Sequence, residues 1–325
     1  MKAEILSALR ESDGYVSGQE LCERFGVSRT AIWKAINQLK NAGYEIEAVQ
    51  NRGYHIISVP DVLSENELKS IRKTEWLGST IVYEPVVDST NTKAMQLAEE
   101  GAPHGTLIVS DRQENGRGRR GRRWETPAGS AIAMTFLLRP EIMPDNASML
   151  TLVAAMAVAR GIEDETQLAV GIKWPNDIVV HGKKICGILT EMSAQVDYVN
   201  HIVIGIGINV QVEDFPEELR QMATSLYMES GKKINRAALI ERICEYFEQY
   251  YAIFMETEDL SRIVKEYDAY MVNRNQPVRV LDPKEPFEGT ARGITARGEL
   301  LVDTWESRRL VSSGEVSVRG IYGYV

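Results

Sequence analysis

Apolar residues in the first forty positions recur every three or four residues, which is the period of a helix. After a short amphipathic stretch near residue 5, the S-x-x-E sequence at 17–20 has the spacing of a capping box and predicts the start of a helix. Gly26 ends that helix, and Ser28 begins another that keeps its apolar period to residue 39. Two helices joined by a tight glycine turn form a helix-turn-helix.

Beyond Gly43 the pattern changes to period two, in Y-E-I-E-A-V and Q-N-R-G-Y-H-I-I. The Asn-Arg-Gly between these runs predicts a hairpin turn, which would form a wing after the helices. The helix from Ser28 to Lys40 carries basic residues and no acid, although residues 1–60 contain seven basic and seven acidic side chains. Positive charge is therefore concentrated where a recognition helix meets phosphates and base edges.

We interpret residues 1–62 as a winged helix-turn-helix domain that binds DNA, with a linker beginning at Pro60. A three-helix scaffold that binds protein or supports the next domain is the alternative. Because one such unit reads only a short half-site, specific binding requires a dimer on a two-fold site. The candidate DNA-contacting residues are Ser28, Arg29, Thr30, Trp33 and Lys34. Trp33 is also a candidate for the core.

The pattern from residue 63 to 273 alternates strands with a few helices. The predicted strands are 81–87, 106–112 and 131–138, followed by a meander of short strands from 170 to 210. The predicted helices are 92–100, 146–161 and two or three more between 217 and 273. Antiparallel hairpins with the helices collected elsewhere predict a mixed α/β domain of the α+β class and argue against a Rossmann fold.

The last fifty residues, 274–325, break into short strand-like runs separated by Gly and Asp-Pro turns. This is the pattern of a small β-barrel, which we take to be SH3-like. The 325 residues are thus expected to form three domains with limits at 62/63 and 273/274, and the overall fold class is α+β.

Composition narrows the class of protein. With 44% hydrophobic and 26% charged residues and a formal net charge of -9, the chain is expected to hold any polyanion through a local patch. Three separated cysteines argue against a disulfide framework and a zinc site. No signal peptide is visible, and the apolar run at 150–159 is about half of the roughly 20 residues that span a bilayer. We expect a cytoplasmic protein without a membrane partner.

The segment G-R-G-R-R-G-R-R-W, residues 116–124, holds five arginines and three glycines and is called the arginine loop below. Glycines let backbone N–H groups approach an anion, and arginine forks pair with phosphate or carboxylate oxygens. Because the arginines repel one another, we expect the loop to be disordered until an anion binds. A basic surface run, a second nucleic-acid contact and a localisation signal are the alternatives.

Two other polar segments lie at strand ends in the middle domain. D-S-T-N-T at 88–92 gathers hydroxyls and an amide where a strand leads into a helix, as a ligand site or as a plain N-cap. K-W-P-N-D at 173–177 presents Asn176 and Asp177, which would face a magnesium ion that bridges nucleotide phosphates or would form an ordinary turn.

Two glycine-containing segments follow. G-K-K-I-C-G at 182–187 places Lys183 and Lys184 just beyond a predicted hairpin turn, where an ammonium group points into a cleft or into solvent. G-I-G-I-N-V at 205–210 is superficially like a dinucleotide fingerprint, but it lacks the third glycine and the following helix. A dinucleotide site is therefore not predicted there.

Taken in order, the winged helix-turn-helix, S-T-N, G-R-G-R-R-G-R, K-W-P-N-D, G-K-K-I-C-G-I-L, G-I-G-I-N-V and a small terminal barrel resemble the biotin protein ligase family, in the bifunctional form that also represses biotin genes. The resemblance covers essentially the whole chain, and the arginine loop together with K-W-P-N-D is its most specific part. It implies that the middle domain is an adenylating ligase domain. Ligases of this family that have no DNA-binding domain lack the first sixty residues, so their presence favours the repressor form.

The resemblance implies that ATP and Mg²⁺ convert biotin to biotinyl-5'-AMP, and that a lysine of a carrier protein then takes the biotinyl group. It implies that Lys184 and Arg119 are the catalytic residues. The implied biotin-binding residues are Ser89, Thr90, Asn91, Gln113, Arg117, Gly118, Arg119 and Lys184. The implied ATP and adenylate residues are Arg119, Arg122, Trp124, Asn176, Asp177 and Asn209, with Asp177 also the candidate magnesium ligand.

The implied acceptor is the biotin carboxyl carrier protein of acetyl-CoA carboxylase, with pyruvate carboxylase a further candidate. Biotinyl-5'-AMP would also act as corepressor and favour a homodimer on operator DNA. A lipoate-type ligase and a ligand-sensing repressor without catalysis are the alternatives. The arginine loop favours biotin over lipoate, and an intact Lys184 favours catalysis.

Overall fold

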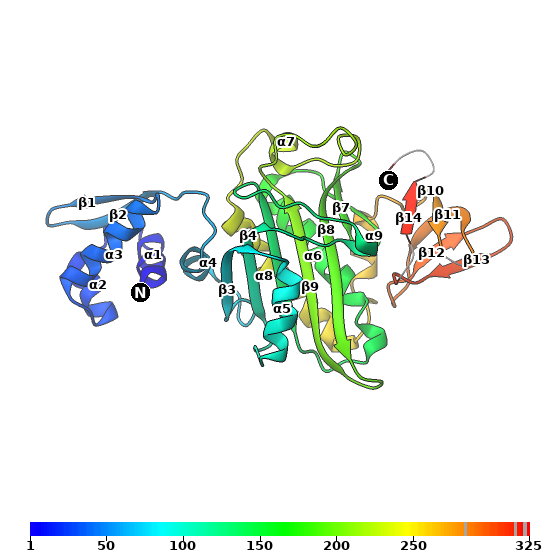
Figure 1. Cartoon of the computed structure of the whole chain (residues 1–325), viewed down its shortest axis with the longest axis horizontal. Helices are drawn as coiled ribbons and strands as arrows, with labels where there is room; N and C mark the ends of the chain where they lie inside the picture. Colours follow the sequence, from blue (N-terminus) through cyan, green and yellow to red (C-terminus); the bar gives the residue numbers. More distant parts are fainter. Residues whose placement is uncertain (283–284, 315–316, 321–323) are drawn as a thin grey trace. The chain divides into compact units, whose positions relative to one another are not determined.

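The computed structural model describes residues 1–282, 285–314, 317–320 and 324–325 (Figure 1). The chain forms two compact units. The first consists of Met1–Lys73 with Asn235–Glu241, and the second of Thr74–Ile234 with Arg242–Val325. The domain limits at 62/63 and 273/274 stay predictions.

The first unit is a winged helix-turn-helix, as predicted. Its elements in chain order are α1 (Lys2–Glu11), α2 (Gly18–Phe25), α3 (Arg29–Asn41), β1 (Glu45–Val49), β2 (Gly53–Ser58) and α4 (Glu65–Ile71). Ser17 Oγ accepts the Glu20 N–H at 3.0 Å, and Ser28 Oγ accepts the Ala31 N–H at 3.3 Å. Gly26 has the left-handed φ of 64° that lets α2 end in a tight turn. β1 and β2 pair antiparallel as the wing.

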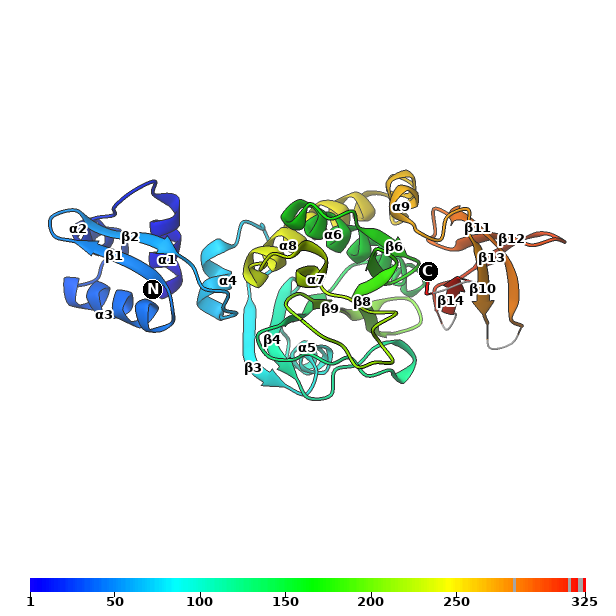
Figure 2. The ribbon, with the colours of Figure 1, turned by 90° about the horizontal axis from the view of Figure 1, so that it is seen from above.

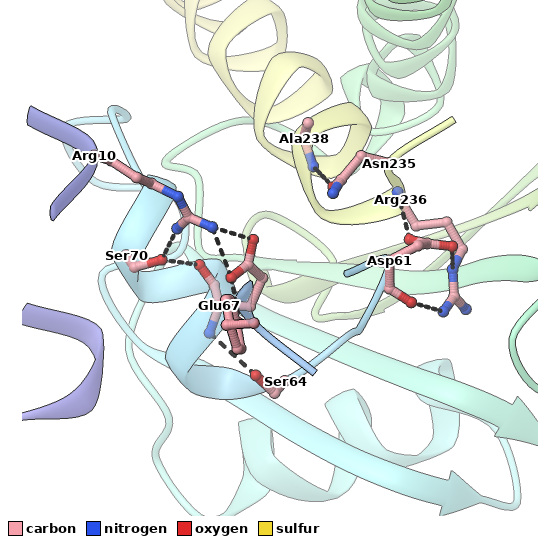
Figure 3. A network of polar contacts seen from close by, with 9 residues as sticks. Arg10, Asp61, Ser64, Glu67, Ser70, Asn235, Arg236 and Ala238 are labelled. Atoms are coloured by element: carbon pink, nitrogen blue, oxygen red, sulfur yellow. Dashed lines mark hydrogen bonds and ion pairs between the residues drawn. The ribbon is translucent and has the colours of Figure 1, made fainter. Parts of the chain in front are cut away.

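The segment after Pro60 was predicted to be a linker, and this prediction was wrong. It contains α4, whose Glu67 is only 1% exposed. Arg10 of α1 donates to both carboxylate oxygens of Glu67 at 2.7 and 2.9 Å (Figure 3). The Tyr44 hydroxyl also donates to Glu67, at 2.5 Å. A buried carboxylate is tolerated because these donors satisfy it.

A second ion pair lies within the first unit. Asp61 accepts the backbone N–H of Arg236 at 2.9 Å and its Nε at 3.0 Å (Figure 3). Arg236 is 2% exposed and is the first residue of α8 (Arg236–Thr257). The residues from Asn235 to Glu241 therefore complete this unit, although they are far from it in sequence.

The second unit is built on a seven-stranded sheet with the order β3-β4-β5-β9-β8-β7-β6. Its strands are β3 (Ile81–Val87), β4 (Thr106–Gln113), β5 (Ala131–Leu138), β6 (Gly171–Lys173), β7 (Asp177–Val180), β8 (Lys183–Ala194) and β9 (Val199–Asn209). Every neighbouring pair is antiparallel except β3 and β4, which are parallel and joined through α5 (Thr90–Glu99). The meander of hairpins predicted from the sequence is confirmed for β6 to β9.

Helices cover both faces of this sheet. Figure 2 shows α6 (Met149–Thr166) and α8 over one face and α5 over the other. All eight residues of β5 are buried, which explains its almost uninterrupted apolar run. The unit also contains α7 (Leu226–Ser230), α9 (Val264–Tyr270) and two short 3₁₀ helices, η1 (Arg119–Gly121) and η2 (Pro144–Asn146). No helix of the described residues is long and apolar enough to cross a membrane.

The predicted short strands near the end of the chain are present. They are β10 (Pro277–Leu281), β11 (Phe287–Ile294), β12 (Leu300–Asp303), β13 (Arg308–Val311) and β14 (Ser317–Gly320). They form an antiparallel sheet in the order β13-β12-β11-β10-β14. Alternating Val278 and Val280 of β10 are fully buried, so one face of this sheet forms its core.

Candidate active site

The polar segments singled out in the sequence meet in one cavity of the second unit. The residues that line it are Ser89, Thr90, Asn91, Gln113, Arg117, Gly118, Arg119, Trp124, Asn176, Lys184, Gly187, Ile188, Leu189, Gly205, Ile206 and Gly207. They come from the start of α5, the end of β4, the arginine loop, the β6–β7 turn and the middle of β8 and β9. These segments are far apart in the sequence, and the sheet brings them together.

The start of α5 forms a pre-ordered polar wall. Gln113 Oε1 accepts the Thr90 N–H at 2.8 Å and the Thr90 hydroxyl at 3.1 Å. Asn91 donates to Glu191 Oε2 at 2.7 Å, and its own Oδ1 accepts the Thr135 hydroxyl at 2.8 Å. Within the described residues Ser89 makes no side-chain capping bond, so plain N-capping does not account for this segment.

The floor of the cavity explains the glycines of G-I-G-I-N-V. A Cβ on Gly205 would collide with Asn91 Oδ1, and one on Gly207 would lie 2.5 Å from Trp124 Nε1. These distances are far shorter than contacts between real side-chain atoms. Glycine is therefore needed at both positions so that Asn91 and Trp124 can pack against the β9 backbone, and the two glycines are not part of a dinucleotide-binding motif. The Trp124 Nε1 is buried without a hydrogen-bond partner among the described residues.

The arginine loop has a hydrogen-bonded path here, and its ordering by an anion stays a prediction. The Gly118 N–H donates to Arg122 O at 2.7 Å, and the Trp124 N–H donates to Gly116 O at 2.9 Å. Arg119 donates to Asn176 Oδ1 at 2.9 Å and to the carbonyl oxygens of Ser313 and Gly314 at 2.6 and 2.5 Å. The Arg119 guanidinium thus donates to oxygen atoms of the protein. Burial lowers the pKa of Arg119 from its ordinary value.

Lys184 is the lysine that enters the cavity, with Nζ 2.6 Å from Asp177 Oδ1 and 5.5 Å from the Trp124 ring centroid. Burial acts to raise the pKa of Asp177, but the Lys184 ion pair and the hydrogen bonds from Lys184 and Tyr324 outweigh it and hold that pKa low. Lys173 is 5% exposed, and burial lowers its pKa to about 8. The site is therefore a buried carboxylate flanked by two lysines.

Some predicted site residues lie elsewhere. Arg122 is exposed, and Asn209 is buried outside the cavity lining, where its Nδ2 donates to Thr224 O at 3.1 Å. Asp177 reaches the cavity only through Lys184, since it is not among the lining residues. The structure does not bring Arg122 and Asn209 into the cavity, so their roles toward ATP stay predictions.

Comparison with known proteins identifies the family. Residues 83–209 match the Biotin/lipoate A/B protein ligase family, residues 2–55 an HTH domain and residues 275–319 the Biotin protein ligase C terminal domain. The chain is 43% identical over 306 residues to the "Bifunctional ligase/repressor BirA" of Bacillus spizizenii, covering 94% of each chain. This chain belongs to the biotin protein ligase family.

Other relatives agree. This ligase is 30% identical to the "Biotin--[acetyl-CoA-carboxylase] ligase" of Paracoccus denitrificans over 72% of its own chain and 98% of the relative. A solved biotin protein ligase from Aquifex aeolicus in complex with biotin and ATP matches with 30% identity and a TM-score of 0.67, covering 74% of this chain and 99% of that one. The full-length match to the ligase/repressor includes the winged helix-turn-helix, and the chain is a bifunctional member of the family.

The winged helix-turn-helix of this ligase exposes the residues predicted to contact DNA. Ser28, Arg29, Thr30, Trp33 and Lys34 are all exposed along the start of α3. Trp33 is 58% exposed, which removes it from the core. Arg29 donates to Gln19 Oε1 of α2 at 2.9 Å, so this guanidinium is held in place beside the helix start.

Sequence reasoning missed three residues of this ligase's active site. Glu191 and Thr135 hold Asn91, and Tyr324 donates to Asp177 Oδ2 at 2.5 Å. Glu191 and Thr135 lie in largely apolar strands, where single polar side chains facing one sheet surface are the signal that could have found them. No local pattern marks Tyr324.

Proposed function

We propose that this ligase joins biotin to ATP to form biotinyl-5'-AMP, transfers the biotinyl group to a lysine of a carboxyl carrier protein, and represses biotin genes with the adenylate as corepressor. The observation that carries the proposal is the position of Lys184 and Arg119 in the same cavity as the buried polar wall Ser89–Asn91. The uncharged hydroxyl and amide groups of the polar wall can hydrogen-bond to the polar ring of biotin. The cations Lys184 and Arg119 can bind the carboxylate of biotin and the phosphates of ATP.

In the first step, a carboxylate oxygen of biotin attacks the α-phosphorus of ATP, and the bond to pyrophosphate breaks. Negative charge develops on oxygens around phosphorus, where fixed cations stabilise the transition state more than the ground state. Lys184 and Arg119 are cations that line the cavity. Both are engaged by protein oxygens in the free enzyme, so substrate oxygens replace partners that are already present.

In the second step, the amine of an acceptor lysine attacks the acyl carbon of the mixed anhydride. The bond from that carbon to the phosphate oxygen breaks, AMP leaves with the electron pair, and the amine loses a proton. Arg119 donates to Asn176, and in this proposal it covers the adenylate against water until the acceptor arrives. The proposed acceptor is a carboxyl carrier domain, and the name of the Paracoccus relative gives acetyl-CoA carboxylase as the substrate of that protein.

Mg²⁺ would accompany ATP. Proteins hold this ion through one or two carboxylates together with phosphate oxygens and water. Asp177 does not fit that role in this structure, because Lys184 and Tyr324 take its two oxygens and it does not line the cavity.

The test is biotin-dependent exchange of pyrophosphate into ATP. Wild type is expected to show exchange with biotin and none with lipoate. Lys184→Ala is expected to lose about two to three orders of magnitude, the scale of removing a charge-stabilising group. Lys183→Ala is the matched control, because the neighbouring lysine does not line the cavity. Exchange supported by lipoate and not by biotin would contradict the proposal.

A further inference from the structure

Two partners hold the carboxylate of Asp177, and one of them comes from the end of the sequence. The Tyr324 hydroxyl donates to Asp177 Oδ2 at 2.5 Å, while Lys184 Nζ lies 2.6 Å from Asp177 Oδ1. The Asp177 and Lys184 side chains are 15% and 24% exposed, so this pair is largely shielded from water. Each oxygen of the carboxylate therefore has one strong partner, one charged and one neutral.

Two further contacts hold Tyr324 and its neighbour in this place. Lys173 Nζ lies 3.4 Å from the centroid of the Tyr324 ring, a close cation–π contact. Val325 packs against the β7–β8 turn, because a Cβ built on Gly182 would meet Val325 Cγ2 at 3.3 Å. Arg119, another residue that lines the cavity, donates to the Ser313 and Gly314 carbonyls.

Adenylation changes the partners of Asp177. When Lys184 turns to the substrate carboxylate and phosphate, Asp177 Oδ1 loses its ion pair in a poorly hydrated place. A buried carboxylate without donors is costly, and this cost opposes release of the lysine. Tyr324 keeps a hydrogen bond on Oδ2 throughout. Because the Tyr324 hydroxyl is neutral, it can donate a hydrogen bond to Asp177 without attracting the anionic substrates, which bind Lys184.

We infer that Tyr324 is a positioning residue for adenylation, which holds Asp177 so that Lys184 can leave the carboxylate for the reacting groups. The inference rests on the proposed function. It gives a residue that follows the C-terminal sheet in the sequence a task in catalysis that neither packing nor acceptor binding requires. The ring contact to Lys173 is separate from this task, since it needs the aromatic face and not the hydroxyl.

The test is Tyr324→Phe, which removes the hydroxyl and keeps the ring over Lys173. We expect kcat for biotin-dependent pyrophosphate exchange to fall about tenfold, the usual effect of losing a hydrogen bond to a charged group. The KM for biotin should stay within about twofold, because the polar wall that would hold biotin's ring does not contact Tyr324. Tyr250→Phe is the matched control, since it removes another tyrosine hydroxyl that donates to a carboxylate, Glu266 at 2.7 Å.

A double-mutant cycle with Asp177→Ala makes the test specific, because alanine has no oxygen to accept the Tyr324 hydroxyl. If Tyr324 acts through Asp177, Tyr324→Phe should have little further effect on exchange or on thermal unfolding when it is added to Asp177→Ala. A kcat unchanged by Tyr324→Phe, or additive losses in both readouts, would overturn the inference while wild-type exchange upholds the proposed function. Absence of exchange in wild type would overturn the proposed function itself.

Discussion

The position of the Trp124 indole at this site depends on Gly207 having no side chain. Its neighbours along β9 are isoleucines with buried side chains, and its own bare face carries the Trp124 indole. Gly207→Ala would put a methyl group 2.5 Å from Trp124 and displace the ring from the cavity floor. Overpacking of this kind costs about 1–3 kcal/mol, so we expect kcat/KM for exchange to fall by about tenfold or more.

Steady-state exchange kinetics check this prediction, with Gly14→Ala as control. A Cβ on Gly14 meets nothing within 4 Å, so that variant should match wild type. Unchanged kinetics for Gly207→Ala would show that the indole can move at no cost.

Lys173 supplies a pH-dependent contribution to stability. Burial lowers its pKa from 10.5 in the unfolded chain to about 8 in the folded one. Between these values the unfolded state binds more protons, so this group makes the free energy of unfolding rise with pH from about 8 to 10.5, by at most about 1.4 kcal/mol per pH unit. Lys173→Met should lose that rise.

Urea unfolding of wild type and Lys173→Met at several pH values measures the difference. The stability advantage of the substituted protein should be greatest below pH 8 and should narrow as pH increases. A difference that is constant across this range would mean that Lys173 is charged in the folded protein throughout.

The element α4 is stabilised by one buried carboxylate. Glu67 is 1% exposed and receives both its strong donors from elsewhere in the first unit, Arg10 and Tyr44. Arg10→Ala removes the charged partner and should destabilise the unit by about 3 kcal/mol, the cost of breaking a buried pair. Arg24→Ala breaks an exposed pair with Glu11 and should cost less than about 1 kcal/mol.

Thermal unfolding, followed by a reporter in the first unit such as Trp33 fluorescence, distinguishes these two variants. Equal shifts in midpoint for Arg10→Ala and Arg24→Ala would contradict the assignment of Glu67 as a buried anchor.

Elements with a local signal were predictable, and contacts over long sequence distances were not. Ser17, Ser28 and Gly26 marked α2 and α3 because caps and turns are made within a few residues. Glu67 looked like a solvated linker residue, since its charged partner is 57 positions away. Tyr324 could not be found for the same reason, because its acceptor is 147 positions away.

The candidate site followed the same rule. The arginine loop, the start of α5 and Lys184 were apparent from composition at strand ends, and the cavity brings them together. The parallel pairing of β3 with β4 was not apparent, because the alternation of buried and exposed residues in a strand does not carry strand direction.

For the whole molecule, ligand and assembly are expected to be linked. A corepressor can favour a dimer only if it binds the dimer-competent state more tightly. Sedimentation should therefore show a larger dimer fraction with biotin and ATP than with either alone, and Lys184→Ala should abolish that increase. An equal dimer fraction under all conditions would show that adenylation does not control dimerisation, and the proposed corepressor role of the adenylate would be wrong.

The DNA-binding charge is local in a chain whose formal net charge is -9. Lys34→Ala should weaken binding to a random-sequence duplex and reduce the salt slope by about one. Lys69→Ala is the control, because that lysine is paired with Glu65 on α4. An unchanged slope for Lys34→Ala, measured by fluorescence anisotropy across salt concentrations, would remove α3 from the phosphate contacts.

The first unit is made of two segments that are far apart in the sequence, 1–73 and 235–241. This limits how the unit could be replaced by another DNA-binding domain, in evolution or by protein engineering. A cassette ending at residue 62 would carry Asp61 and leave behind Arg236, as well as the whole of α4 with Glu67. A chimaera that gives this ligase another DNA specificity therefore has to transplant two segments, 1–73 and 235–241, or keep both and change only the exposed face of α3. Recombination within the gene at a single point near codon 62 would more often yield an impaired repressor than a new one.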